Sequence, residues 1–282
     1  MPVKINNLVI VSDLHCGCRL GLCPPRGIRL DDGGRYEPSN FQKKIWKYWQ
    51  HFWDVFVPEA TRNESFGILI NGDAIEGVHH RSTTQISHNL EDQKHIAVEV
   101  LAKLVEICKG KFWMVRGTEA HVGSSACDEE SIAKELGAIP NEEGQYARYE
   151  LFKTVGDKLV HALHHVGTTG SQAYEATAVH KELVESFIES ARWGRRFPDF
   201  VVRSHRHRHI ETVIATGDDS SQHTSRATSV TTPGWQGKTP HGWKIAGARL
   251  STPQFGGIVI RSAKGETFVR SKVWTVERSK TE

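Results

Sequence analysis

Short apolar segments alternate with longer amphipathic ones through the first half of the chain. The short segments are rich in β-branched and aromatic side chains, as expected of strands that are buried on both faces. The predicted strands cover residues 8–13, 66–70 and 112–115. Because helix-like segments lie between them, the order predicts an α/β architecture.

Apolar side chains that recur every three or four residues predict the helices. One covers 41–57, with Ser39 as its N-cap, and another covers about 124–136. The helix at 89–108 should bury one face. That face is made of Ile96, Val100, Leu104 and Ile107.

The second half contains more strand-like segments. A hairpin is expected at 148–152 and 158–163, a helix at about 171–192 and a strand at 200–203. Short strands punctuated by glycine and proline should follow, ending in a hairpin formed by 257–261 and 267–274. We find no repeat and no linker, so we expect one domain over 1–282. Its fold should be of the α/β (α+β) class, with two packed mixed β-sheets (a β-sandwich) flanked by helices.

The composition is ordinary for a globular protein, with 38% hydrophobic and 24% charged residues and a net charge of +3. So small a charge does not by itself predict nucleic-acid binding. No stretch approaches the ~20 apolar residues that span a bilayer, so no membrane partner is expected. Five cysteines cannot all pair with one another, and we expect free thiols in a cytoplasm. Cys16, Cys18 and Cys23 are crowded together but lack the CxxC spacing typical of a soft-metal site.

Histidine is unusually frequent, with 16 residues, and several stand in pairs or two positions apart. Potential metal ligands follow four predicted strands, as Asp13-Leu14-His15, Gly72-Asp73, His164-His165 and His205-Arg206-His207. If the chain stays extended, Asp13 and His15 lie on one face. Because ligands converge at the carboxyl ends of strands in open α/β sheets, we predict a site for two cations with a carboxylate between them.

The order of these residues resembles the calcineurin-like metallophosphoesterases, in which DxH, GD, GNH(D/E), a lone His and GHxH each follow a strand. The corresponding segments are Asp13-Leu14-His15, Gly72-Asp73, Gly117-Thr118-Glu119-Ala120-His121, His164 and Ser204-His205-Arg206-His207. The resemblance covers about residues 8–209 and the strands beyond. It implies a β-sandwich flanked by helices, and hydrolysis of a phosphoester by a metal-bound hydroxide.

The resemblance also implies the ligands of two divalent metal ions, for which Mn, Fe, Zn, Co and Ni are all suitable. One metal is implied on Asp13, His15 and His207. The other is implied on His164 and His205. Asp73 would bridge the two metals and so take part in catalysis. We choose His164 over His165 because the family ligand tends to be the earlier of such a pair.

The chain departs from the family pattern at 117–121, where no asparagine can give the second metal an amide oxygen. Thr118 occupies the aligned position, but a hydroxyl is a poor ligand. We therefore predict Glu119 as the ligand, with Thr118 as the alternative. His121 is the candidate acid that protonates the leaving group. The Gly-Thr-Glu-Ala-His form and the Gly-Leu-Cys-Pro-Pro loop at 21–25 are similar to phosphoesterases encoded by bacteriophages, so a host cytoplasm is the expected location.

Three further features have two interpretations each. His80 and Arg81, in the loop after Asp73, are candidates for binding a phosphate oxygen, and a solvated loop explains them equally well. The aromatic, lysine-bearing helix 41–57 is expected to pack into the core rather than to stack on bases. The basic residues at 192–196 are expected to be a solvated helix end.

We predict a phosphoester substrate, with a phosphodiester or nucleic acid favoured because the long loop 16–38 suits an extended molecule. DNA and nucleotides are the candidate partners. One alternative is a phosphomonoesterase that acts on nucleotides or proteins. Another is a catalytically silent metal-binding scaffold, which is disfavoured because nearly all of the ligands are present. The oligomeric state is not predicted.

Overall fold

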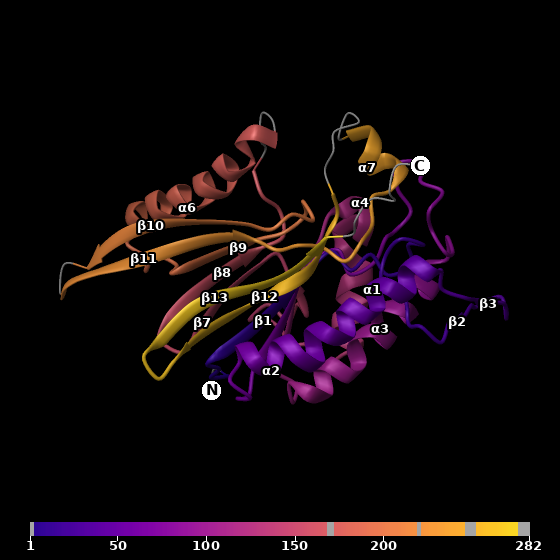
Figure 1. Cartoon of the computed structure of the whole chain (residues 1–282), viewed down its shortest axis with the longest axis horizontal. Coiled ribbons are helices and arrows are strands. Elements are labelled where there is room, and N and C mark those ends of the chain that lie inside the picture. Colours follow the sequence, from indigo (N-terminus) through magenta and orange to yellow (C-terminus); the bar gives the residue numbers. More distant parts are fainter. Residues whose placement is uncertain (1–2, 168–171, 219–220, 246–251, 276–282) are drawn as a thin grey trace.

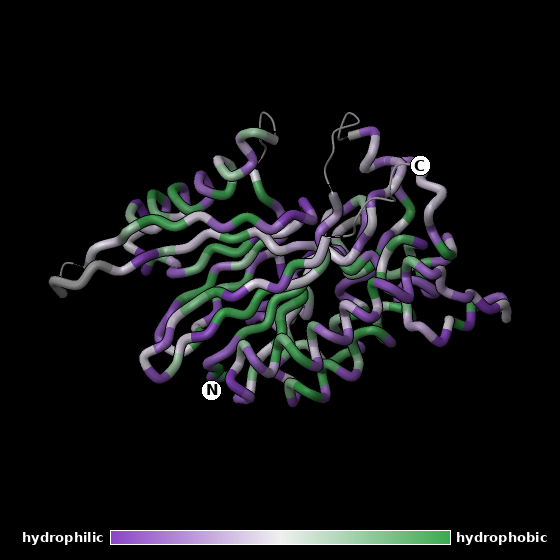
Figure 2. Tube along the Cα trace, viewed as in Figure 1, coloured by the Kyte–Doolittle hydropathy of each residue, from purple (hydrophilic) through white to green (hydrophobic). Residues whose placement is uncertain are grey.

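The computed structural model describes residues 3–167, 172–218, 221–245 and 252–275. Two large sheets lie face to face with helices on both outer sides, so the molecule has four layers (Figure 1). Buried apolar side chains form the cores between the sheets and beneath the helices. The central strands are accordingly mostly hydrophobic along the chain trace (Figure 2). The predicted α/β fold with two packed mixed sheets is therefore confirmed. None of the helices in these ranges is long and apolar enough to cross a membrane.

The first sheet is mixed and has six strands. In order across the sheet they are β13 (Glu266–Thr275), β12 (Gln254–Ala263), β1 (Asn7–Val11), β4 (Gly67–Asn71), β5 (Phe112–Val115) and β6 (Ala147–Arg148). Strands β1, β4, β5 and β6 run parallel to one another. Strand β12 is antiparallel to β1, and β13 is antiparallel to β12. The carboxyl ends of β1, β4 and β5 therefore meet at one edge of the sheet.

The second sheet is also mixed and has five strands. In order they are β10 (Ile210–Asp218), β11 (Ser221–Thr231), β9 (Phe200–Arg203), β8 (Lys158–Leu163) and β7 (Glu150–Val155). The expectation of only short strands after 204 is wrong, because β10 and β11 form a hairpin with 9 and 11 residues. Threonine is frequent in both strands and favours extended backbone without giving an apolar pattern. A small ribbon of β2 (Ile28–Arg29) and β3 (Arg35–Tyr36) lies within the loop that follows β1.

Alternate residues of each central strand face opposite layers. Leu8 and Ile10 of β1 point into the core between the sheets, where they join Val160 and Val202 of the second sheet. Val9 points the other way, into the core beneath the helices. Both faces of these strands are covered, which explains why they form unbroken apolar runs in the sequence.

The helices over the first sheet agree with the apolar periodicity except at two places. They are α1 (Asn40–His51), a π-helical turn (Phe52–Phe56), α2 (Val57–Ala60), α3 (Leu90–Ile107), α4 (Glu119–Val122), a 3₁₀ turn (Ser124–Ala126) and α5 (Cys127–Glu135). Ser39 caps α1 in a capping box with Gln42, as predicted. The predicted helix 41–57 is interrupted by the π-helical turn and extends to Ala60. Ile107 is 46% exposed rather than buried, because it is the last residue of α3.

One long helix covers the outer face of the second sheet. After a 3₁₀ turn (Gln172–Tyr174), α6 (Glu175–Arg192) buries Val179 and Leu183, and Leu183 packs against β9 and β11. Residue 171, where this helix was expected to begin, lies outside the described residues. The short α7 (Pro240–Ile245) lies beside the loop that follows β4, since His241 stacks on His80 of that loop.

Candidate metal centre

Six predicted ligands gather where strands of both sheets end. The residues that follow the strands are Asp13 and His15 after β1, Asp73 after β4, His164 after β8, and His205 and His207 after β9. They form two groups of potential metal ligands, whose donor atoms lie within 4.8 Å of one another in each group. One group holds Asp13, His15 and His207, and the other holds Asp73, His164 and His205. The structure thus brings together the six residues that the motifs predicted.

The backbone at these loops is unusual. The φ angles of five candidates are positive, with 54° at Asp13, 45° at His15, 53° at Asp73, 72° at His205 and 51° at His207. The chain is therefore not extended from Asp13 to His15, and the predicted reason for their shared orientation is wrong. Hydrogen bonds between loops hold the turn instead, from the Asp13 amide to Gly72 O and from the His15 amide to Asp73 O. Left-handed residues cost free energy and cluster at functional sites.

In the first group the donor atoms are close neighbours. His207 Nε2 lies 3.2 Å from Asp13 Oδ1 and 3.1 Å from His15 Nε2. Asp13 is fully buried, and its Oδ1 accepts no hydrogen bond from the described residues. Donors that surround one cation at about 2.1 Å are about 3.0–3.4 Å apart. The spacing and the unsatisfied carboxylate oxygen therefore fit a divalent cation.

The second group is centred on the carboxylate of Asp73. Its Oδ2 lies 3.1 Å from His164 Nε2 and 4.0 Å from His205 Nδ1. The same oxygen is 4.0 Å from Nε2 of His15, a member of the first group. Asp73 Oδ2 thus lies within 4.0 Å of histidine nitrogens from both groups.

The electrostatics of the cluster favour positive charge. Burial opposes ionisation of Asp13, but the adjacent His207 outweighs it and lowers the carboxyl pKa to about 2. Burial likewise opposes protonation of His164, but Asp73 outweighs it and raises the imidazole pKa to about 10. Burial opposes ionisation of Asp73, but the combined effect of His164, His121 and His205 holds its pKa well below the usual range. The buried carboxylates stabilise a cation at this place.

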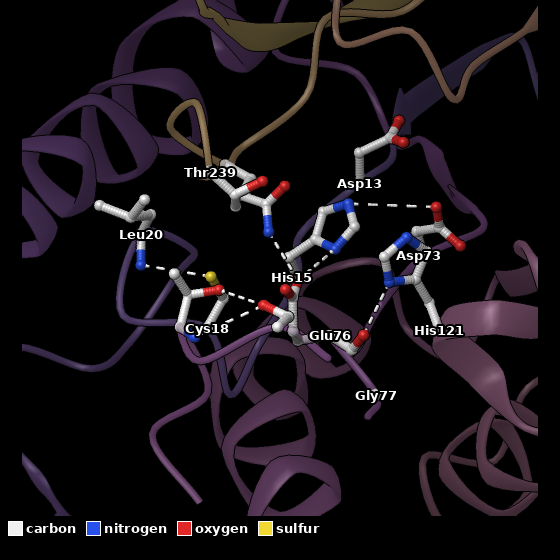
Figure 3. A network of polar contacts seen from close by, with 12 residues as sticks. Asp13, His15, Cys18, Leu20, Asp73, Glu76, Gly77, His121 and Thr239 are labelled. Carbon is white, nitrogen blue, oxygen red and sulfur yellow. Dashed lines mark hydrogen bonds and ion pairs between the residues drawn. The ribbon is translucent and has the colours of Figure 1, made fainter. Parts of the chain in front are cut away.

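Glu76 is a member of the site that the sequence reasoning missed. Its Oε2 lies 2.9 Å from His15 Nδ1, so carboxylate and imidazole form a pair (Figure 3). The other ring nitrogen of His15, Nε2, is the one that faces His207. Glu76 is buried, and its carboxylate also accepts from Gln236 Nε2 at 2.6 Å. A carboxylate on the outer nitrogen of a ligand histidine fixes its tautomer and orientation. The sequence offered one indication of Glu76, since it is an acidic residue three positions after the predicted ligand Asp73.

His121 lies against the same pair. Its Nδ1 is 2.7 Å from the carbonyl oxygen of Glu76, and its ring meets that of His15 edge to face at 4.6 Å (Figure 3). His15, Glu76 and His121 form a third potential ligand group. Burial lowers the pKa of His121 to about 4, although Asp73 opposes the shift. The structure therefore places this candidate acid beside the predicted centre.

Thr118, rather than Glu119, faces the second group. The Thr118 amide donates to Asp73 Oδ1 at 2.6 Å, and its hydroxyl lies 3.1 Å from His205 Nδ1 and 3.4 Å from His164 Nε2. Glu119 is exposed and belongs to none of the ligand groups in the described residues. The group beside His164 and His205, where the family pattern has an asparagine, is thus the hydroxyl of Thr118.

His80, Arg81 and His165 belong to none of the potential ligand groups in the described residues. His80 and Arg81 are exposed, and His80 stacks on His241 at 4.3 Å without reaching either group. His165 is exposed, whereas its neighbour His164 is fully buried against Asp73. Neither His80 nor Arg81 belongs to a group of potential metal ligands in the described residues, so their predicted role in binding substrate stays a prediction.

Two other sequence features take no part in the centre. The cysteines Cys16, Cys18 and Cys23 are buried free thiols, and burial raises the pKa of Cys18 and Cys23 to about 12. No cysteine of the described ranges belongs to a potential ligand group. In the helix 41–57, Trp49, Phe52 and Phe56 are buried, which confirms the core interpretation.

No protein-family model matches the chain, and no curated protein matches it. Solved structures do show similarity. Vacuolar protein sorting 29 from Cryptosporidium parvum is 13% identical with a TM-score of 0.35, over 97% of this chain and 100% of that chain. Vps29 from Chaetomium thermophilum is 12% identical with a TM-score of 0.37, and the match covers 98% of this chain and 99% of that chain. A metallophosphoesterase from Sphaerobacter thermophilus is 13% identical with a TM-score of 0.35, and the match covers 97% of this chain and 89% of that chain. Since these values are low, we derive a function only from the residues of this chain.

Proposed function

We propose that the chain is a dinuclear metal-dependent phosphoesterase of the calcineurin-like type. The observation that carries the proposal is the place of Asp73, whose buried carboxylate lies within 4.0 Å of histidine nitrogens from both groups of potential ligands. The donor set of carboxylates and imidazoles suits borderline divalent cations. Asp13, His15 and His207 would hold one cation, His164 and His205 the other, and Asp73 would be shared.

Bound cations would supply Lewis acidity toward the phosphoryl oxygens and toward the attacking water. The chain itself supplies orientation and proton transfer. Glu76 fixes His15 through Nδ1, and the Glu76 carbonyl fixes His121 through its Nδ1. The His121 Nε2 is thereby left to exchange a proton with the substrate.

We propose a phosphodiester, such as a nucleic acid, as the substrate class. Support comes from the rim, where exposed His80 and Arg81 lie beyond His79, whose ring contacts that of His121 at 4.2 Å. A basic side chain outside the two ligand groups would bind a second phosphate of an extended substrate, which a compact monoester lacks.

The test is a metal-dependence screen. Protein stripped of metal would be assayed with Mn²⁺, Fe²⁺, Zn²⁺, Co²⁺ or Ni²⁺ on an aryl phosphomonoester, an aryl phosphodiester and single-stranded DNA. We expect turnover that requires added metal, is lost in Asp73→Asn and is kept in Asp54→Asn, which changes an exposed acid of the π-helical turn. If folded protein turns over none of these substrates with any metal, the catalytic proposal fails and a silent scaffold is the better explanation.

A further inference from the structure

We infer that Glu129 is a positioning residue that joins the two loops around Asp73 and thereby sets the affinity of the second metal position. The inference rests on the proposed function. Glu129 lies in the first turn of α5, ten residues beyond Glu119, and belongs to neither predicted ligand group. It is fully buried.

The contacts of Glu129 join two loops of the centre. One carboxylate oxygen, Oε1, accepts from the amide of Ala74 at 2.9 Å, and the other, Oε2, accepts from the amide of Gly117 at 2.6 Å. Ala74 directly follows Asp73, and Gly117 directly precedes Thr118. A single side chain thus fixes the loop after β4 and the loop after β5 relative to each other.

The loop after β4 and the loop after β5 are in close contact at Asp73 and Gly117. A Cβ atom added to Gly117 would lie 2.1 Å from Asp73 Oδ1 and 2.3 Å from its amide nitrogen. Through this contact the Thr118 amide reaches Asp73 Oδ1, and the Thr118 hydroxyl reaches His205. A shift of either loop would move both the shared carboxylate and the hydroxyl beside it.

The charge of Glu129 points to the same role. No lysine or arginine of the described ranges pairs with it, and within these ranges its carboxylate accepts hydrogen bonds from the two amides alone. Glu129, Asp73, Asp13 and Glu76 are all buried within the loops of one site. Asp13, Asp73 and Glu76 each pair with a histidine, whereas Glu129 has no such partner among the described residues, and burial beside Asp73 raises its pKa to about 7. The concentration of negative charge is explained if the folded protein binds metal.

The adjacent Glu130 provides a matched comparison. Its two carboxylate oxygens also accept two backbone amides, those of Tyr146 at 2.9 Å and Ala147 at 2.7 Å. These amides belong to the region of β6 and carry no predicted ligand. Glu130→Gln should therefore remove the same kind of interaction from the same helix without disturbing the centre.

The experiment is calorimetric titration of metal-stripped protein with Mn²⁺ and with Zn²⁺, for the wild type, Glu129→Gln, Glu130→Gln and Glu129→Asp. We expect two binding events in the wild type and in Glu130→Gln. In Glu129→Gln the weaker event should lose roughly 10–100-fold in affinity, as is typical when a partner behind the ligands is removed. Thermal unfolding of the metal-free proteins shows whether both Gln variants are folded and similarly destabilised.

Equal metal affinities in Glu129→Gln and Glu130→Gln would overturn the inference while leaving the proposed function intact. Absence of metal binding in the wild type would instead overturn the proposed function as well. Glu129→Asp separates position from charge and also serves if Glu129→Gln does not fold. It keeps the charge but cannot span both amides, so full recovery of the weaker binding event would show a purely electrostatic effect and contradict positioning.

Discussion

The Nδ1 atom of His15 lies 2.9 Å from Oε2 of Glu76, and both side chains are almost completely buried. The other ring nitrogen, Nε2, faces His207 at 3.1 Å. A histidine held in this way presents one nitrogen to the centre in a fixed tautomer. Glu76 should therefore determine how well the first group binds a cation, although it does not itself face that group.

Replacing Glu76 by Gln should weaken metal binding. The amide keeps the shape of the side chain but lacks the charge that orients and polarises His15, so the first binding event should lose roughly 10–100-fold in affinity. Titration of metal-stripped protein with Mn²⁺ measures this directly.

A matched control is Glu150→Gln. Glu150 also pairs with a histidine, His161, at 3.1 Å, but Glu150 is exposed and neither residue belongs to a ligand group in the described residues. Its replacement should leave metal affinity unchanged. An equal affinity in Glu76→Gln and wild type would mean that the Glu76–His15 pair serves folding alone.

Thr118→Asn should strengthen the second metal position. The hydroxyl of Thr118 lies 3.1 Å from His205 Nδ1, and an amide oxygen there is a better ligand than a hydroxyl. We expect a rise of about tenfold in the weaker affinity, of the order seen for changes around metal ligands. Glu119→Gln should change nothing, because Glu119 is exposed and outside the ligand groups. A loss of metal binding in Glu119→Gln would reinstate Glu119 as the ligand.

The metal-free protein should lose stability as the pH rises. The pKa of His164 is raised from 6.5 to about 10 in the folded state by Asp73. A group with a raised folded pKa stabilises the protein fully below its unfolded pKa, and this contribution is lost as pH rises toward the folded value. The free energy of unfolding should therefore fall between about pH 6.5 and pH 9, measured by urea denaturation in the presence of a chelator.

The variant His164→Gln isolates this effect, since it cannot titrate. It should be less stable than the wild type at pH 6 and should show a flatter dependence between pH 6.5 and 9. A decline of the same steepness in both proteins would show that the His164–Asp73 pair is not its source.

Much of the fold was predictable because the central strands are buried on both faces. Val9 and Leu8 face different cores, so both must be apolar, and the segment stands out in the sequence. The long hairpin of β10 and β11 was not predicted in full, because polar side chains such as Thr212 and Thr216 give no alternation to detect. Periodicity reports burial, and it fails where a strand is partly exposed.

The clustering of the candidate ligands was predictable because each follows a strand and belongs to a residue type that binds metals. The carboxylates that support them were not, since Glu76 and Glu129 bind through backbone and histidine contacts between distant loops. A signal for Glu129 does exist. It stands in line with Ile132 and Ala133 on the buried face of α5, where a charged residue is unusual.

His121→Ala should slow the hydrolysis of substrates with poor leaving groups most. Since Nδ1 contacts the Glu76 carbonyl, a proton for the leaving group has to be carried on Nε2. Loss of a general acid costs typically 10²–10⁴-fold, and less when the leaving group is already stable as an anion. We expect a loss of about 10²-fold or more on a dinucleotide and a smaller loss on an aryl phosphodiester.

The pH dependence of hydrolysis tests whether His121 donates the proton to the leaving group. Burial lowers the pKa of His121 to about 4, so the doubly protonated ring becomes more abundant as pH falls from 7 to 5. Relative to the aryl ester, hydrolysis of the dinucleotide should therefore rise over this range in the wild type and stay flat in His121→Ala. Measuring both substrates in the same buffers cancels any loss of metal at low pH. Equal losses on both substrates, with no difference in pH dependence, would show that His121 orients groups in the site and does not donate the proton.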